Sequence, residues 1–459
     1  MASHKFSLSP KSVPMVHTKY RSIQTEIPAP GTAEIFSRLE KFESRSMQGQ
    51  LPIVWDKANN FSVSDIAGNC WIDFTSTIFV ANVGHSNRRV SDAISRQLAH
   101  PLYSCYAYAN PVRADYIERL IEFAGKPFEK AFLLSAGTEA TEATMKLMRM
   151  NGQKKGKRRR GIICIENNWH GRTLGAQMMS SNLAQRDWIG YQDADVHHIP
   201  FPYPWRLDSL NGEEFLHQGI NELAAKGIDL AQDVCGFMLE TFQGWGAVFY
   251  PKDFVRAIEK VCRENSILLA FDEMQAGFGR TGKAFGYMHY EVTPDLIACG
   301  KGMGGGVPLS GVIGCSEVMD LPDVGNMSST HSANPMACAA GLAVLDELRS
   351  RGLITEAERK GKLFRSALES IQKRFPERVS WILGNGMIYA ILFKDPETGK
   401  PDAEFTSQVT ECCMQKGLLV VHTGRESIKL GPPLTITDDA LMEGLSVLDE
   451  AIAEVVEND

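Results

Sequence analysis

The sequence predicts an α/β protein, in which helices cover both faces of a mostly parallel sheet in a large domain, with a smaller α+β domain beside it. From about residue 90 onward, short apolar runs alternate with segments of helical spacing, the pattern of successive strand–helix–strand units. The runs are apolar throughout, as expected of strands buried on both faces. They cover residues 131–134, 161–165, 234–239, 267–271, 296–299 and 309–313.

The chain has 459 residues, more than one comfortable hydrophobic core accommodates. We therefore expect it to divide into three segments. Residues 1–75 form an N-terminal arm and part of the small domain, residues 76–334 form the large domain, and residues 335–459 complete the small domain.

The elements outside the large sheet follow from turn signals and helical spacing. In the N-terminal part, the sequence Asp65-Ile66-Ala67-Gly68-Asn69 lies between alternating stretches and predicts the turn of a hairpin. In chain order, we expect an extended arm over 1–30, a helix in 31–47, the hairpin over 53–74, a long helical stretch over 339–375, strands within 379–393 and 418–430, and a closing helix over 438–456.

The composition is ordinary for a globular protein, with 44% hydrophobic residues, 22% charged residues and a net charge of −7. This charge gives no electrostatic case for nucleic acid or an anionic membrane, and the basic run at 154–160 lacks interleaved aromatic residues. No apolar run approaches the roughly 20 residues of a membrane span, and the N-terminus lacks the apolar core of a secretory signal. The ten cysteines show no CxxC pair or metal-ligand spacing. We expect reduced thiols in a cytoplasmic protein with no metal site.

Two neighbouring strands are predicted to end on chemically active side chains. The run 267–271 is followed by Asp272, and the run 296–299 is followed by Lys301, which stands between two glycines. Ligands of open α/β sheets bind outside the carboxyl ends of the strands. A lysine that forms a Schiff base and a carboxylate that keeps a pyridine nitrogen protonated are what a pyridoxal phosphate site requires. The alternatives are a solvated lysine and an aspartate that caps a helix.

Three further strand ends carry functional groups. Gly137 and Thr138 open a helix, where free N–H groups and the helix dipole suit a phosphate; a plain helix cap is the alternative. Trp169 and His170 follow another strand, where the indole could lie on a planar ring or merely cover the sheet edge. Glu240 opens a third junction. A purely structural sheet is not expected to carry such groups at five strand ends.

These motifs resemble the class III aminotransferases, a fold type I family of pyridoxal phosphate enzymes that includes ornithine and 4-aminobutyrate aminotransferases. The resemblance extends from about Thr25 to the C-terminal helix. Its motifs are GTEATEAT from Gly137, WHGRT from Trp169, ETFQGWG from Glu240, FDEMQAGFGRTGKAF from Phe271, GKGMGGGVPLSGVIG from Gly300 and STHSANP from Ser329.

The resemblance implies a role for each matching residue. Lys301 would bind the cofactor aldehyde and move the proton at the substrate Cα, while Asp272 would pair with the pyridinium nitrogen. The remaining implied cofactor contacts are Gly137 and Thr138 at the phosphate, Trp169 and Met274 on the two ring faces, His170 and Glu240 close by, Gln275 at the phenolic oxygen, and Thr330 at the phosphate of the neighbouring subunit of a homodimer.

Three positions depart from the family pattern. Ala136 stands where a serine often precedes the phosphate-loop glycine, a change that keeps the backbone N–H groups. Trp245 replaces the glutamate that masks a carboxylate-binding arginine in ornithine-type members, and Lys429 replaces that arginine. A lysine offers a point charge instead of a planar fork, so recognition of 2-oxoglutarate in the ornithine-enzyme manner is in doubt. We expect Trp245, Lys429, Phe79, Tyr106 and Tyr108 to shape an aromatic substrate pocket with modest positive charge; Lys429 as a surface strand residue is the alternative.

The resemblance implies an aminotransferase that moves an amino group from a primary amine or ω-amino compound to a 2-oxo acid. An ammonia-lyase acting on a phosphorylated or phosphonate amine, a racemase and a decarboxylase remain open, because all use the same lysine. A relative that has lost activity and serves as a binding module is disfavoured by the intact Lys301, Asp272 and Gln275. A nucleotide site at Gly302–Gly306 is excluded because the G-x-G-x-x-G spacing is absent.

Overall fold

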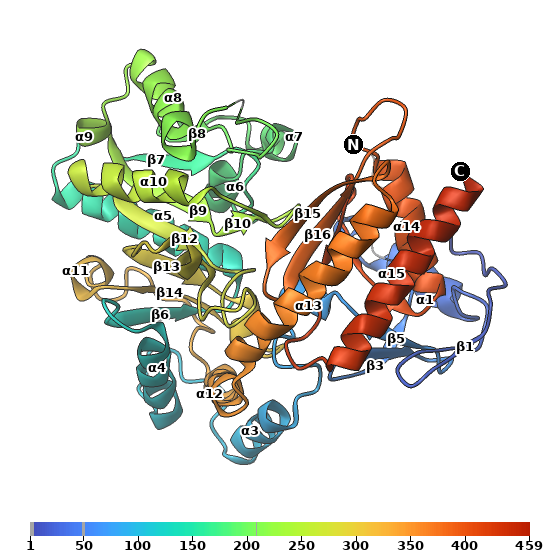
Figure 1. Ribbon diagram of the computed structural model, residues 1–459. Helices are drawn as coiled ribbons and strands as arrows, with labels where there is room; N and C mark the ends of the chain where they lie inside the picture. Colours follow the sequence, from blue (N-terminus) through green and yellow to red (C-terminus); the bar gives the residue numbers. More distant parts are fainter. Residues whose placement is uncertain (1–3, 48–50, 208) are drawn as a thin grey trace. The chain divides into compact units, whose positions relative to one another are not determined.

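The computed structural model describes residues 4–47, 51–207 and 209–459. The chain forms two compact units (Figure 1). The large unit comprises residues 88–244 and 248–354, and the small unit comprises residues 1–87, 245–247 and 355–459. Each unit is described separately below.

The large unit is built on a seven-stranded sheet in the order β6-β14-β13-β12-β9-β7-β8. The strands are β6 (Lys130–Leu134), β7 (Gly161–Ile165), β8 (Val196–Ile199), β9 (Val234–Glu240), β12 (Leu268–Asp272), β13 (Leu296–Cys299) and β14 (Ser310–Gly314). All neighbours pair in parallel except β14, which runs antiparallel to both β13 and β6. Strands β7, β9, β12, β13 and β14 consist entirely of buried residues, which explains their continuous apolar sequences.

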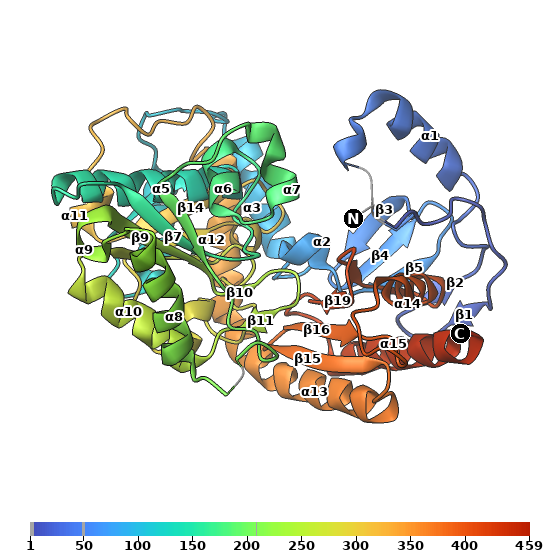
Figure 2. The same cartoon turned by 90° about the horizontal axis from the view of Figure 1, so that it is seen from above.

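Helices cover both faces of this sheet (Figure 2). Helix α5 (Gly137–Lys154) lies on one face, whereas α8 (Gly212–Ala225) and α10 (Lys252–Glu264) lie on the opposite face. Helix α10 buries Phe254, Val255, Ile258, Val261 and Cys262, which recur at the three- and four-residue spacing of one helix face. Burial of that stripe fixes which side of α10 meets the sheet.

The other elements of the large unit are shorter or lie at its edge. They are α3 (Arg88–Ala99), α4 (Pro111–Ala124), α6 (Leu174–Met179), α7 (Leu183–Arg186), η2 (Asp187–Ile189), α9 (Leu230–Asp233), the hairpin of β10 (Phe242–Gln243) and β11 (Val248–Phe249), η3 (Gly286–Tyr290), η4 (Lys301–Met303), α11 (Ser316–Met319) and α12 (Pro335–Ser350).

The small unit contains two sheets and the long helices of the C-terminal part. One sheet combines β1 (Val16–His17), β2 (Ser22–Ile23), β5 (Cys70–Asp73), β4 (Ser62–Asp65), β3 (Trp55–Asn59) and β17 (Leu418–Leu419). The other has the order β15 (Val379–Asn385), β16 (Ile388–Phe393), β19 (Ser427–Leu430) and β18 (Val421–His422). The helices are α1 (Thr32–Phe42), η1 (Arg45–Met47), α2 (Ser76–Phe79), α14 (Ala403–Gln415) and α15 (Asp438–Asn458), and α13 (Leu353–Arg374) begins at the boundary between the units.

The structure confirms the predicted fold class and differs from the sequence prediction in details. Strand β8 was not predicted, because His197 and His198 interrupt its short apolar pattern. The expected stretch 339–375 is two helices, and the break between them contains Gly352 at a φ of +57°, which a continuing helix excludes. The expected domain boundaries after residues 75 and 334 differ from the unit boundaries after 87 and 354, because α12 packs against α3 and α4. Among the described residues, no helix is long and apolar enough to cross a membrane.

Candidate active site

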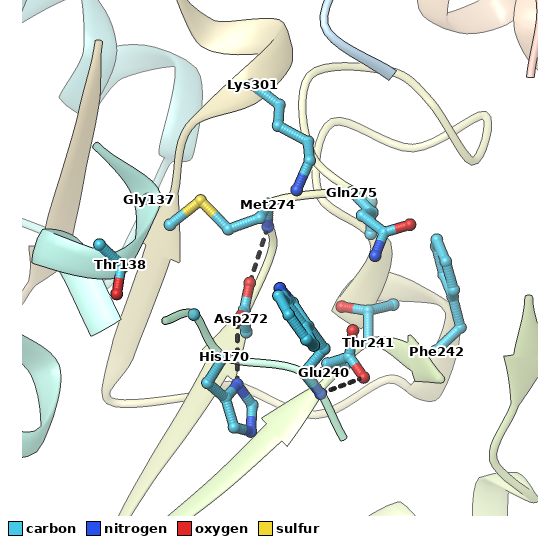
Figure 3. Close-up of a pocket in the computed structure, with 13 residues that line it drawn as sticks. Gly137, Thr138, His170, Glu240, Thr241, Phe242, Asp272, Met274, Gln275 and Lys301 are labelled. Carbon is cyan, nitrogen blue, oxygen red and sulfur yellow. Dashed lines mark hydrogen bonds and ion pairs between the residues drawn. The ribbon is translucent and has the colours of Figure 1, made fainter. Parts of the chain in front are cut away.

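A pocket with about 420 Å³ of empty space lies at the carboxyl ends of the parallel strands of the large unit (Figure 3). The pocket is lined by Gly137, Thr138, Trp169, His170, Gly171, Glu240, Thr241, Phe242, Asp272, Met274, Gln275, Ala276 and Lys301. Nine of the ten predicted cofactor residues are therefore gathered in one cavity.

The sheet register places three charged groups side by side. Asp272 is the last residue of β12 and pairs with Glu240, the last residue of β9. Lys301 follows β13 by two positions, and β13 is the other neighbour of β12. Parallel strands bring their carboxyl ends to the same edge of a sheet, so the pattern of strand ends in the sequence becomes a cluster of side chains.

Lys301 is held in an uncommon backbone conformation. Its φ of +42° lies in the left-handed region that non-glycine residues rarely adopt. Burial lowers the pKa of the Lys301 ammonium, while the carboxylates of Asp272 and Glu240 act in the opposite direction. A lysine with a lowered pKa has a larger fraction of neutral amine, the form that attacks a carbonyl carbon.

Asp272 is oriented by hydrogen bonds to both carboxylate oxygens. The Met274 N–H donates to Oδ1 at 3.0 Å, and His170 Nδ1 lies 2.9 Å from Oδ2 (Figure 3). Donors to the two oxygens fix the plane of the carboxylate, and a carboxylate held in this way suits a protonated ring nitrogen.

The candidate phosphate site is the N-terminus of α5. The Glu139 side chain accepts hydrogen bonds from the N–H groups of Ser135 and Ala136, at 3.0 and 2.8 Å, and thereby closes the loop before the helix. Gly137 and Thr138 are the first helical residues, and N–H groups in a first helical turn have no partner within the helix. Thr138 Oγ1 lies 2.6 Å from Thr173 Oγ1, which positions the threonine hydroxyl. This end of the helix is an anion site with a preformed hydroxyl beside it.

Glu240 organises the opposite wall of the pocket. Its Oε2 accepts hydrogen bonds from the N–H groups of Trp169 and Gly244, at 3.1 and 3.3 Å. The Arg172 guanidinium carbon lies 4.5 Å from the centre of a Trp169 ring, so the indole carries a cation beside it. The sequence analysis did not single out Arg172, although it lies in the WHGRT motif.

The donor set fits pyridoxal phosphate. The pocket combines a lysine with a lowered pKa, a buried oriented carboxylate, an indole and a helix N-terminus. When bound, this cofactor supplies an aldehyde that reacts with amines and a ring that withdraws electrons from the substrate Cα. Each of these chemical requirements has a matching group among the residues that line the cavity.

The remaining predicted residues lie outside this pocket. Thr330 is exposed in the large unit, next to Ser329, which lines a second cavity together with Tyr106. Tyr108 is 79% exposed. The segment that contains Thr330 therefore lies on the surface, available to another molecule.

Three predicted substrate residues belong to the small unit. Lys429 is only 6% exposed, so the alternative of a surface lysine is wrong, and its Nζ lies 4.7 Å from the centre of the buried Phe79 ring. The ring of Trp245 lies against Arg425, whose guanidinium carbon is 3.8 Å from the ring centre. Arg425 was missed in the sequence because nothing in its local pattern points to Trp245, 180 residues earlier.

The comparison with known proteins decides the family. A family model for class III aminotransferases matches residues 44–452. The chain belongs to the class III aminotransferases. The resemblance predicted from the motifs is thereby confirmed over most of the chain.

Individual relatives of this class III aminotransferase agree. It is 33% identical over 408 residues to an acetylornithine aminotransferase of Caldanaerobacter subterraneus subsp. tengcongensis, covering 88% of the chain and 95% of the relative. It is 30% identical over 449 residues to a 4-aminobutyrate aminotransferase of Mycobacterium leprae, covering 95% and 98%. Among solved structures, the PLP-bound amine transaminase from an uncultivated Pseudomonas species superposes with a TM-score of 0.80 at 27% identity, covering 90% and 97%.

The enzyme is therefore a pyridoxal-phosphate-dependent aminotransferase that transfers an amino group from an amine to a 2-oxo acid. Each relative named above is an aminotransferase, and none of these findings supports the lyase alternative. The predicted cofactor and enzyme class are confirmed, whereas the roles of individual residues remain predictions.

Proposed function

We propose that Lys301 and Asp272 are the catalytic residues of this aminotransferase. The observation that carries the proposal is the convergence of Glu240, Asp272 and Lys301 on the ends of three adjacent strands. With pyridoxal phosphate bound, the Lys301 amine would hold the cofactor aldehyde and would move the proton at the substrate Cα. Asp272 would hold the proton of the ring nitrogen.

The other pocket residues position the cofactor in this proposal. Gly137 and Thr138 would bind its phosphate at the N-terminus of α5, Trp169 and Met274 would pack on the ring, and Gln275 would contact the phenolic oxygen. Glu240 accepts a hydrogen bond from the Trp169 N–H, and His170 contacts the Asp272 carboxylate.

We infer that the small unit contributes the carboxylate recognition of the 2-oxo acid. Two cations lie on aromatic rings there, Arg425 on Trp245 and Lys429 on Phe79. Ser427 Oγ donates to the Trp245 carbonyl at 3.0 Å and ties the backbone of Trp245 to β19. A guanidinium matches a carboxylate bidentately, which the lysine alone does not. Arg425 Nε and Nη2 each donate to the Glu426 carboxylate at 3.3 Å, so an acidic acceptor would exchange with Glu426 for this guanidinium.

The working unit is proposed to be a homodimer in which Thr330 reaches the cofactor phosphate of the partner. Support comes from the exposed Tyr108, from the fully exposed Val324 and from the cavity that Tyr106, Val324 and Ser329 line. Mixing Lys301→Ala and Thr330→Ala chains tests this: a mixed dimer contains one site with both residues intact and regains activity. Failure to regain activity in verified mixed dimers contradicts the shared site. We further propose a cytoplasmic location, in keeping with ten free thiols.

A panel of amines, assayed with and without 2-oxo acids, tests the proposed function. We expect a 2-oxo-acid-dependent amino-acid product with half-reactions that occur separately, and no product from the Lys301→Ala variant. Steady release of ammonia without any 2-oxo acid would contradict it. Comparing 2-oxoglutarate with pyruvate distinguishes an acidic acceptor, because only the former presents a second carboxylate to the small unit.

A further inference from the structure

Asp272 is the first of a line of buried polar side chains that contact one another in sequence, and the far members of this line do not contribute to the pocket wall. His170 Nδ1 lies 2.9 Å from Asp272 Oδ2, and its other ring nitrogen, Nε2, lies 3.4 Å from Asn168 Nδ2. The Tyr250 hydroxyl donates to Asn168 Oδ1 at 3.4 Å. The relative exposures of Asn168, His170, Asp272 and Tyr250 are 5% or less, and all four belong to the large unit.

The hydrogen bonds of this line run in one direction. An ionised carboxylate only accepts, so the hydrogen of His170 is on Nδ1. The Asn168 amide nitrogen only donates, so His170 Nε2 keeps its lone pair. With the Asn168 amide in this orientation, the Tyr250 hydroxyl donates to the amide oxygen at 3.4 Å. In this arrangement Tyr250 donates to Asn168, Asn168 donates to His170, and His170 donates to Asp272.

Tyr250 is fixed in place and remains protonated. Burial raises its pKa well above the usual value of 10, and the nearby Glu240 carboxylate acts in the same direction. The ring stacks on Phe254 at a centroid distance of 5.6 Å, and the Tyr250 N–H donates to the Tyr290 hydroxyl at 3.1 Å. The phenol is therefore a constant donor over the whole physiological pH range.

His198, another titratable neighbour of this line, does not supply a competing charge. Burial lowers the pKa of His198 to about 4, so its ring is neutral at neutral pH. The His170 backbone N–H is taken by Ser180 Oγ at 2.8 Å, which fixes the start of the side chain. The two ring nitrogens of His170 thus face Asp272 on one side and Asn168 on the other.

We propose that Asn168 and Tyr250 are positioning residues that hold His170 as the neutral tautomer with its hydrogen on Nδ1. A neutral His170 leaves the negative charge of Asp272 for the cofactor ring nitrogen, whereas a doubly protonated His170 would withdraw it. The proposal rests on the role proposed above for Asp272. It adds that the hydrogen-bonding partner of Asp272 is positioned from Tyr250, through Asn168.

The test is ¹⁵N NMR of histidine-labelled holoenzyme, with the His170 signals identified by their loss in His170→Gln. Wild type should show the Nδ1–H tautomer at pH 7. Asn168→Asp places an acceptor at Nε2 and should produce a doubly protonated ring. Tyr250→Phe frees the Asn168 amide to turn and should shift the His170 ring nitrogens. Both variants should lower kcat by roughly tenfold, with a smaller effect on KM.

Tyr203→Phe is the matched control, since Tyr203 lies in the same aromatic cluster through Phe201 but outside the line. It should leave the His170 signals and kcat unchanged. Finding wild-type His170 doubly protonated or as the Nε2–H tautomer overturns the proposal. Unchanged His170 signals in Tyr250→Phe and Asn168→Asp overturn it as well. If Asp272→Asn retains full transamination, the proposed role of Asp272 fails instead, and the NMR result still decides the tautomer.

Discussion

Gly171→Ala tests the candidate phosphate site without altering any polar group. Gly171 has a φ of +138°, and a Cβ there would lie 2.7 Å from Thr138 Cβ and would overlap Thr138 Oγ1. Thr138 must therefore move, together with its contact to Thr173. We expect the variant to fold and to bind pyridoxal phosphate more weakly.

The size of the effect follows from two separate terms. An alanine at this φ costs roughly 1–3 kcal/mol of folding stability. Displacing Thr138 removes one hydrogen bond to a charged phosphate, worth about 1.5–3 kcal/mol, which corresponds to a rise in the cofactor Kd of roughly 12- to 140-fold. The second term affects binding only, so the two can be measured separately.

The assay is titration of cofactor-depleted enzyme with pyridoxal phosphate, alongside thermal unfolding. Gly190→Ala is the control, because Gly190 also has a positive φ, of +74°, but a Cβ there meets nothing within 4 Å. Gly190→Ala should lower Tm and leave the cofactor Kd unchanged. An unaltered Kd in Gly171→Ala would refute the assignment of Thr138 to the phosphate.

Three further changes probe other parts of the site. Lys301→Ala should abolish transamination and the visible absorbance of the bound cofactor, and residual turnover would show that another base acts. Without cofactor, the variant should unfold no more easily than wild type, because the substitution removes a lysine whose pKa is lowered by burial. Lys429→Ala should raise KM for anionic substrates only. If the KM for pyruvate and the KM for 2-oxoglutarate are the same in the variant as in wild type, Lys429 does not bind a substrate carboxylate. Burial raises the pKa of Glu273 from 4.5 to about 7, so the folded state holds this proton more tightly and the free energy of unfolding should fall by about 3 kcal/mol as pH rises through that interval. In Glu273→Gln, the free energy of unfolding measured with urea at several pH values should no longer show this decrease. The same pH dependence in the variant and in wild type would show that Glu273 does not cause it.

The central site was predictable from sequence because it consists of strand ends. Apolar runs locate the strands, parallel pairing brings their carboxyl ends together, and so Asp272, Glu240 and Lys301 could be placed in one site. The motifs around these residues also identified the family. The division between the two units was harder to predict, since it depends on how α12 packs against α3 and α4.

The sequence by itself determined the fold class, the family and the residues that line the cavity, since each depends on patterns that can be recognised along the chain. The tertiary structure decided which other side chains contact these residues and position them. His170 meets Asp272 across 102 residues, Tyr250 meets Asn168 across 82, and Arg425 meets Trp245 across 180. Local spacing carries no information about such contacts, because they form only when loops from separate strands are fixed by packing of the whole unit.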